Sequence, residues 1–517
     1  MYTSHAATSG PSQSVSYPLV GVLLLLSAST QAQDAAPDPA SAEAFRVTPR
    51  ISVTQTLSDN IRLTTTATQS DQVTRISPGV RVVSQGGRLQ GSFDYALEQL
   101  TYAQNTSADS HRHALQANAT LEAVADWAFI DFNGSVSQQA VSAFGAQSSD
   151  SVAIDANRTE VSSYRVSPYL RGRIGNLVDY EARYSRTDTK SDSIASDVTT
   201  QDSLVKLSGA SAFKNLDWAA DVSQQKVDYS AGRATESQHL NLALSYAITP
   251  QLRVSAFGGR ETNNFTTLDK EAHATSGIGL DWLPSEITRF QASRSQHAFG
   301  DTHAVSLAHR TPKTAWRFSD SRNVSVTPSQ SGLVGQGAVF DILFDQFAAV
   351  EPNPTTRAQL VNAYLLANGI SPGAVVVSSY LTSAVALQRR QDVSLALMGA
   401  RDTVTFVASR TRSSRLDSVS VGADDLSSSQ VMFQRGLSIN YAHRLTPDYA
   451  LGVQLSQQKT SADQSLQDTS LHSFKVSLTG RLGKNSTGMV SVVRVVSGGG
   501  ASPYAENTVT VNLVVQF

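Results

Sequence analysis

The sequence of 517 residues contains no cysteine. An exported chain without cysteine cannot be held together by disulfides, so its fold must be stabilised by other interactions. Charged residues are also scarce, at 16% of the chain, which is low for a soluble protein of this size. The net charge of −2 and the absence of a basic stripe give no electrostatic basis for binding nucleic acid.

Long apolar runs are missing as well. The stretch 19–26 is apolar and is followed by small residues and by Thr30-Gln31-Ala32, but about 20 apolar residues are needed to cross a bilayer as a helix. We therefore expect a cleaved signal peptide over residues 1–32, followed by a short periplasmic segment over 33–44. Because no Lys or Arg precedes the run, a retained anchor and a translation start further along the chain are alternatives.

From residue 45 onward, apolar and polar residues alternate with a period of two, the spacing of a β-strand that has one apolar face. In the stretch 178–185 the apolar positions are Val178, Tyr180, Ala182 and Tyr184. Many such segments exceed the roughly 5–6 residues of a soluble strand and suit the about 9–11 residues that cross a bilayer at a tilt. Short turn motifs alternate with longer polar stretches, as periplasmic turns alternate with outer loops in membrane barrels. The turn motifs lie at 85–87, 175–176, 214–215, 249–250, 283–284, 312–313, 399–401, 446–447 and 483–485, and the polar stretches include 142–159, 187–200, 263–271, 413–429 and 461–469.

These patterns predict an all-β fold, a transmembrane antiparallel up-and-down β-barrel of about 22 strands, in the bacterial outer membrane. Residues 45–326 would form its first part and residues 386–517 its C-terminal part. A soluble propeller or solenoid is the alternative, but it has no reason to alternate short and long connections. The chain ends on an alternating strand whose last residue, Phe517, is a candidate signal for the barrel assembly machinery.

Residues 327–385 break the pattern with helical spacing. Phe340, Phe344 and Phe347 recur on one helical face, and a second helix beginning near Asn353 places Leu360 and Tyr364 on another. We expect this short helical insert to fold inward as a constriction or plug of the lumen, with Arg389 and Arg390 in a basic group at its end. An external cap and a partner-binding lid are the alternatives.

Charged residues at alternating positions are candidates for the lumen wall, where they would tune which solutes pass. An arginine group would favour acidic sugars, whereas ordinary lining or contact with lipopolysaccharide phosphates is the simpler interpretation. The candidates are Asp179, Glu181, Arg183, Lys475 and Arg481.

Catalytic motifs are not apparent. The sequence has no P-loop, no HExxH and no GxSxG motif, and it suggests no catalytic residue, cofactor or metal site. The closest histidine pair, His111 and His113, falls in a polar stretch and is expected to be solvent-exposed. We therefore do not expect an enzyme.

Several segments resemble the outer-membrane β-barrel family associated with PEP-CTERM/exosortase systems, a branch of the β-barrel porin type. They are VTPRISV at 47–53, SDNI at 58–61, GRLQGSFDY at 87–95, ADW at 125–127 and LALMGARDTV at 395–404. The resemblance covers residues 45–517 and implies a barrel that serves exopolysaccharide export or envelope assembly, with no catalytic residues to carry over. A general small-solute diffusion porin and a barrel enzyme acting on lipid or surface polymer are the alternatives. The expected partners are outer-membrane lipid and lipopolysaccharide, the barrel assembly machinery and exopolysaccharide export proteins.

Overall fold

The computed structural model describes most of the predicted barrel. The described residues are 45–326 and 380–517, apart from gaps at 85, 105, 149–151, 176, 193–196, 231, 383, 417–423, 464–467 and 501–502, together with Leu343, Phe344, Arg357 and Val361. The expected signal peptide (1–32), the segment 33–44 and most of the expected insert (327–385) lie outside the described residues.

The described chain is dominated by β-strands, as the period of two predicts. The first eleven are β1 (Phe45–Ser58), β2 (Asp71–Ser84), β3 (Leu89–Tyr102), β4 (Ser110–Val124), β5 (Ala128–Ala140), β6 (Arg158–Ile174), β7 (Val178–Ser191), β8 (Val198–Ala210), β9 (Leu216–Tyr229), β10 (Thr235–Thr249) and β11 (Leu252–Asn263). The remaining eleven are β12 (Glu271–Ser285), β13 (Thr288–His297), β14 (Gly300–Arg310), β15 (Thr314–Ser325), β16 (Ala386–Met398), β17 (Asp402–Arg415), β18 (Val431–Arg444), β19 (Tyr449–Ala462), β20 (Thr469–Arg481), β21 (Ser486–Gly499) and β22 (Tyr504–Gln516).

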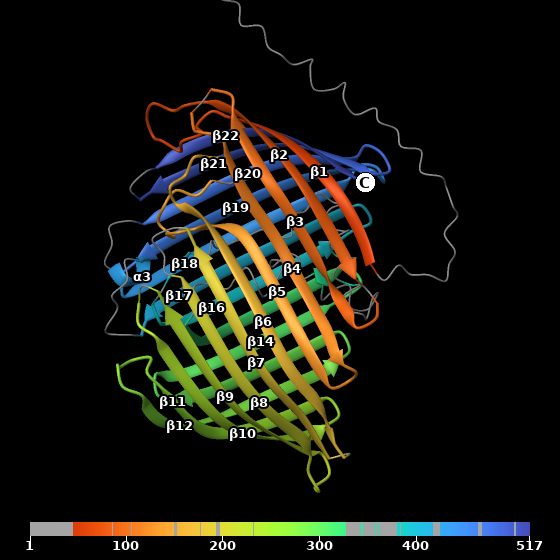
Figure 1. The fold of residues 1–517 in the computed structure, drawn as a ribbon, viewed down its shortest axis with the longest axis vertical. Helices are drawn as coiled ribbons and strands as arrows, with labels where there is room; N and C mark the ends of the chain where they lie inside the picture. The colour runs from red at the N-terminus through yellow and green to blue at the C-terminus, as the bar shows by residue number, and fades with distance from the viewer. Residues whose placement is uncertain are drawn as a thin grey trace, which may run out of the picture. The chain divides into compact units, whose positions relative to one another are not determined.

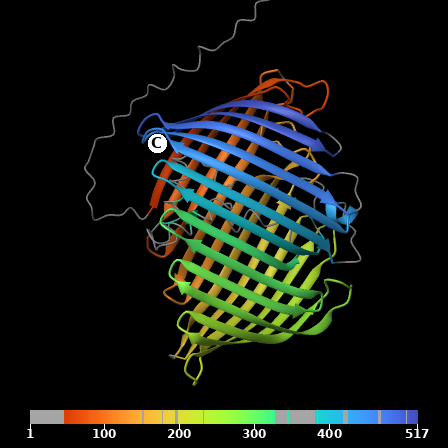
Figure 2. The same cartoon turned by 180° about the vertical axis from the view of Figure 1, so that it is seen from behind.

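The strands form one closed sheet of 22 strands, which Figures 1 and 2 show from opposite sides. Each strand pairs antiparallel with the next in sequence, and β1 pairs with β22 from Arg50↔Gln516 to Ser58↔Thr508, which closes the barrel. Closure leaves no free sheet edge, so every strand satisfies its backbone hydrogen bonds within the sheet. The predicted closed, antiparallel, up-and-down barrel of about 22 strands is confirmed.

The sheet has an apolar outer face and a polar inner face. In β10 the large side chains at every second position are about half exposed. The residues between them, such as Asn241 and Ser245, point to the other side of the sheet. Residues paired across neighbouring strands share a face, so the register assigns every strand position to the outer or the inner face. The exposed positions of β10 are Leu240, Leu242, Leu244, Tyr246 and Ile248.

The two ends of the barrel differ in their connections. At one end, hereafter the short-turn end, strands are joined by tight turns in which Gly87 and Asn215 have φ of 68° and 65°. The C-terminus lies at this end, where the Phe517 N–H donates to the Pro49 carbonyl over 2.9 Å, and its side chain is exposed. The predicted turn at 283–284 is misplaced, because both residues belong to β12 and the turn follows at 286–287; the turn after β4, at 125–127, was not predicted.

The other end, hereafter the outer mouth, carries the longer connections and the described helix α3 (Asp425–Ser428), labelled at the left of Figure 1. Asp424 caps α3, because its side chain accepts from the Ser427 N–H. Among the described residues, no helix has the length and apolar character to span a membrane. Four described residues of the expected insert, Leu343, Phe344, Arg357 and Val361, are helical. The predicted plug itself is not among the described residues, and neither are Phe340, Phe347, Leu360 and Tyr364.

Aromatic side chains mark the short-turn end of the outer face. Trp127, Trp282 and Trp316 are each about half exposed there, and Trp127 Nε1 donates to the Tyr180 hydroxyl over 2.8 Å. Aromatic residues flanking an apolar belt on a closed barrel are the features of an outer-membrane protein. The chain is therefore a β-barrel of the bacterial outer membrane.

Candidate functional site

The described residues of the connection between β5 and β6, 141–148 and 152–157, are hereafter the crossing loop. The sequence suggested an ordinary polar outer loop here. Instead, Ala143, Val152 and Ala153 are no more than 2% exposed. A loop that buries its apolar residues must pack on the protein, and this loop packs across the outer mouth.

The crossing loop contacts the opposite wall of the barrel. The Ser142 hydroxyl donates to the Asp425 carboxylate over 2.8 Å, and the Ala143 N–H donates to its other oxygen over 2.7 Å. Asp425 belongs to α3, between β17 and β18, which are separated from β5 and β6 by about half of the 22 strands. Ala140 also forms a parallel bridge with Tyr380, just before β16. The crossing loop thus joins opposite walls of the barrel.

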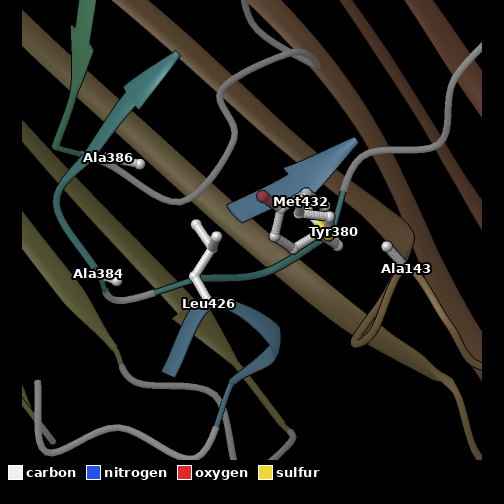
Figure 3. Close-up of a cluster of buried hydrophobic side chains, with 6 residues drawn as sticks. All are labelled: Ala143, Tyr380, Ala384, Ala386, Leu426 and Met432. Atoms are coloured by element: carbon white, nitrogen blue, oxygen red, sulfur yellow. The ribbon is translucent and has the colours of Figure 1, made fainter. Parts of the chain in front are cut away.

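An apolar cluster surrounds this junction (Figure 3). Leu426 of α3 and Met432 of β18 are fully buried, and Phe144 of the crossing loop packs against the cluster. Burial of this apolar surface stabilises the closed arrangement in addition to the hydrogen bonds. The cluster consists of Ala143, Tyr380, Ala384, Ala386, Leu426 and Met432.

The crossing loop is also anchored to strands nearer its own wall. The Ser148 hydroxyl donates to the fully buried Glu506 carboxylate of β22 over 3.2 Å, and Ser58 of β1 donates to the same carboxylate. The Tyr102 hydroxyl donates to the Val152 carbonyl over 3.0 Å. These contacts place the loop over β1, β3 and β22.

A further apolar cluster covers another part of the outer mouth. Val326 and Val385, next to β15 and β16, pack with Val227 and Tyr229 of β9 and with Phe265 after β11. The Tyr229 hydroxyl donates to the Val326 carbonyl. In both clusters, side chains from well-separated strands therefore meet at this end of the barrel.

The crossing loop and the groups that it contacts at the outer mouth are hereafter the closure. Burial changes the acidity of the carboxylates in the closure. It raises the pKa of the Asp425 carboxyl, and the nearby Asp424 charge acts in the same direction, although the hydrogen bonds from Ala143 and Ser142 oppose it. Burial also raises the pKa of Asp155 in the crossing loop. The closure thus contains carboxyl groups that hold their protons more tightly than exposed ones.

Three of the candidate lumen charges lie together on the inner face of β7. Arg183 bonds to Asp131 of β5 over 2.8 Å and to Glu181 over 2.9 Å. Asp179 pairs with Arg173 over 2.6 Å, near the short-turn end. The inner wall here is lined with compensated charges.

Arg183 also belongs to an aromatic patch on the inner face. Its guanidinium lies 3.8 Å from the centre of the Tyr169 ring, which stacks on Phe129 with 5.2 Å between centroids. Arg171 lies 4.2 Å over the Phe129 ring. Tyr169, which is paired with Arg183 in the register of β6 and β7, therefore faces the lumen.

The other candidates are dispersed. Lys475 and Arg481 are on the inner face of β20, and Arg481 pairs with Asp448 over 2.5 Å at the short-turn end. Arg389 and Arg390 do not form one group, because successive residues of a strand face opposite sides. Arg390 is on the inner face beside Asp392, whereas Arg389 is on the outer face.

The structure also places Phe344 and the histidine pair His111 and His113. Phe344 of the predicted insert lies under the Arg357 guanidinium, which is 4.6 Å from the ring centre. His111 and His113 are in β4 rather than in a loop, on the outer face, where the Tyr95 hydroxyl and His113 Nδ1 are 2.9 Å apart. Within the described ranges, no three His, Cys, Asp or Glu side chains are grouped as metal ligands would be.

The residues of the closure were not predicted. Ser142, Asp425 and Leu426 lie in polar stretches. Tyr380 lies in the expected insert and Glu506 near the start of β22, and the contacts of all five join distant parts of the chain. One signal was present: the polar stretch contains Ala143-Phe144 and Val152-Ala153-Ile154, which an outer loop has no reason to expose.

No family model matches the sequence, and no curated protein matches it either. Solved structures match by fold. The apoprotein form of the FrpB iron transporter from Neisseria meningitidis (F5-1 variant) is 10% identical with a TM-score of 0.50, over 91% of this chain and 81% of that one. The siderophore receptor PirA from Acinetobacter baumannii is 9% identical with a TM-score of 0.48, over 91% of this chain and 80% of that one. At such identities the likeness concerns the barrel fold alone.

Proposed function

We propose that this chain is a gated outer-membrane channel for polar cargo, which serves exopolysaccharide export or envelope assembly, as the resemblance to exosortase-associated barrels implies. The observation that carries the proposal is the contact between Ser142 and Asp425 across the outer mouth. A diffusion porin needs a permanent path for solutes. A loop held on the opposite wall by hydrogen bonds and buried apolar contacts is better suited to a channel that opens for its cargo.

The inner face supports a carbohydrate cargo. Hydroxyl and amide side chains such as Ser438, Asn440 and Gln454 occupy successive inner positions of β18 and β19. These groups can exchange hydrogen bonds with sugar hydroxyls. Arg171 and Arg183, whose guanidinium groups cover the Phe129 and Tyr169 rings, add further hydrogen-bond donors for sugar hydroxyls.

The absence of native cysteine allows a direct test. In the variant Ser142→Cys/Asp425→Cys, a short reversible thiol cross-linker would hold the crossing loop on the opposite wall. We expect surface polysaccharide to fall in the cross-linked cells and to recover after reduction. The matched control is Asp197→Cys/Ser230→Cys on neighbouring loops of one wall, where the Asp197 backbone N–H donates to the Ser230 hydroxyl over 2.9 Å.

Two outcomes would contradict the proposal. If the cross-linked barrel exports as much polysaccharide as the reduced one, the crossing loop is no gate for that cargo. If deletion of the chain reduces small-solute uptake and leaves surface polysaccharide unchanged, the diffusion porin is correct instead.

A further inference from the structure

The outer face of β15–β19 carries cations on directly paired positions. Arg322 of β15 is opposite Arg389 of β16, which is opposite Arg412 of β17. The next outward-facing pair of residues along a strand is hereafter one rung away. One rung further from the outer mouth, Arg410 is opposite Arg435 of β18, which is opposite Lys459 of β19. We call these six residues the cation ladder: Arg322, Arg389, Arg410, Arg412, Arg435 and Lys459.

Such an arrangement is unfavourable without a ligand. Like charges directly opposite each other on a sheet destabilise it. Asp320 neutralises Arg389 over 2.6 Å, and Asp468 lies 3.2 Å from Lys459. In the part of the chain that the structure describes, no carboxylate lies within ion-pair distance of Arg410 or Arg435. These two exposed arginines are direct partners and have no anion between them.

An apolar groove lies next to the ladder on the same outer face. It has a volume of about 350 Å³ and is lined by Leu437, Ile439, Leu455, Phe474 and Val496, with His472 and Arg494 beside them. Leu437 is two residues from Arg435 towards the short-turn end, so the groove begins one rung below the ladder. Charge near the outer mouth and an apolar groove nearer the membrane centre match the polarity of a lipid.

We propose that the cation ladder and this groove bind a phosphorylated glycolipid of the outer leaflet, with its phosphates on Arg410 and Arg435 and an acyl chain in the groove. Arginine donates paired hydrogen bonds to phosphate oxygens, and each such bond is charge-assisted. A free phosphate would use the ladder and leave the groove empty, so the groove favours a lipid. The inference depends on the membrane location of the barrel and not on its cargo.

The test uses the full-length protein in detergent and measures binding of lipid A by native mass spectrometry. We expect Arg410→Gln/Arg435→Gln to weaken binding by about tenfold or more, because two charge-assisted contacts are lost. Arg410→Lys/Arg435→Lys should retain most of the binding, which separates loss of charge from misfolding. The matched control is Lys190→Gln/Arg260→Gln. Both residues are exposed cations on the outer face near the outer mouth, and Arg260 is opposite the uncharged Leu240 and Ala274.

Two comparisons identify the ligand chemistry. First, dephosphorylated lipid A should bind to the native protein as weakly as lipid A binds to Arg410→Gln/Arg435→Gln. Second, millimolar inorganic phosphate should not displace lipid A from the native protein. Equal binding of dephosphorylated lipid A would overturn the proposal. It would also be overturned by displacement with inorganic phosphate alone, or by an equal loss in the Lys190→Gln/Arg260→Gln control.

Discussion

Ser142 and Asp425 come from opposite walls of the barrel and meet over its outer mouth, where the serine hydroxyl donates a 2.8 Å hydrogen bond to the carboxylate. The same carboxylate accepts the Ala143 N–H over 2.7 Å. One side chain therefore satisfies two donors of the crossing loop. Any opening movement of this loop away from α3 must break both hydrogen bonds.

Asp425→Ala should release the crossing loop. Two donors lose their acceptor, and each buried group left unsatisfied costs about 1–3 kcal/mol. We expect faster hydrogen exchange over residues 141–157 and a higher single-channel conductance in planar bilayers. Asp448→Ala is the control, because Asp448 pairs with Arg481 at the short-turn end. Unchanged exchange in Asp425→Ala would show that the loop is held elsewhere.

The closure should strengthen on acidification. Burial raises the pKa of Asp425 above its ordinary value of 3.8, so the closed state binds the proton more tightly than a state in which this carboxyl is exposed. The closure is then favoured as the pH falls through the raised value and weakened as the pH rises above it. Conductance should therefore increase with pH over that interval. Asp425→Asn, which cannot ionise at this position, should lose the part of this dependence that Asp425 supplies and keep the part that comes from Asp155. A conductance that falls with rising pH would contradict the assignment.

Leu426→Ala should loosen the same closure through packing. Leu426 is fully buried in the cluster of Figure 3, and removing a buried leucine side chain costs about 2–5 kcal/mol. Because α3 lies outside the sheet, we expect proteolysis of the crossing loop while the barrel keeps its resistance to unfolding in detergent. Leu437→Ala is the control, since Leu437 is exposed on the outer face. Loss of the whole barrel would show that α3 is required for the sheet itself.

The sequence was sufficient for the barrel and insufficient for its closure. A strand with one face towards lipid and one towards water must alternate, so the period of two in stretches such as 178–185 identifies the strands and separates their two faces. The same rule separates Arg389 from Arg390, and grouping them by proximity in sequence overlooked it. The contact between Ser142 and Asp425 joins residues that are 283 positions apart, and no local pattern specifies such a pair. The position of Tyr169 near a turn does not reveal which face it occupies, whereas its register with Arg183 does.

Arg183→Gln should alter the ion selectivity of the opened channel. Arg183 compensates Asp131 and Glu181 on the inner face, so its replacement leaves two carboxylates in contact with the lumen. The measurement is best made in the Asp425→Ala background, in which we expect the outer mouth to be open. We expect the reversal potential in a salt gradient to shift towards cation selectivity, with a change in permeability ratio of about twofold, since one of many wall charges is removed. Arg186→Gln is a matched control three residues along the same strand, because Arg186 pairs with Asp188 on the outer face. If both variants shift the potential equally, the effect comes from net charge at the membrane surface and Arg183 does not line the conducting path.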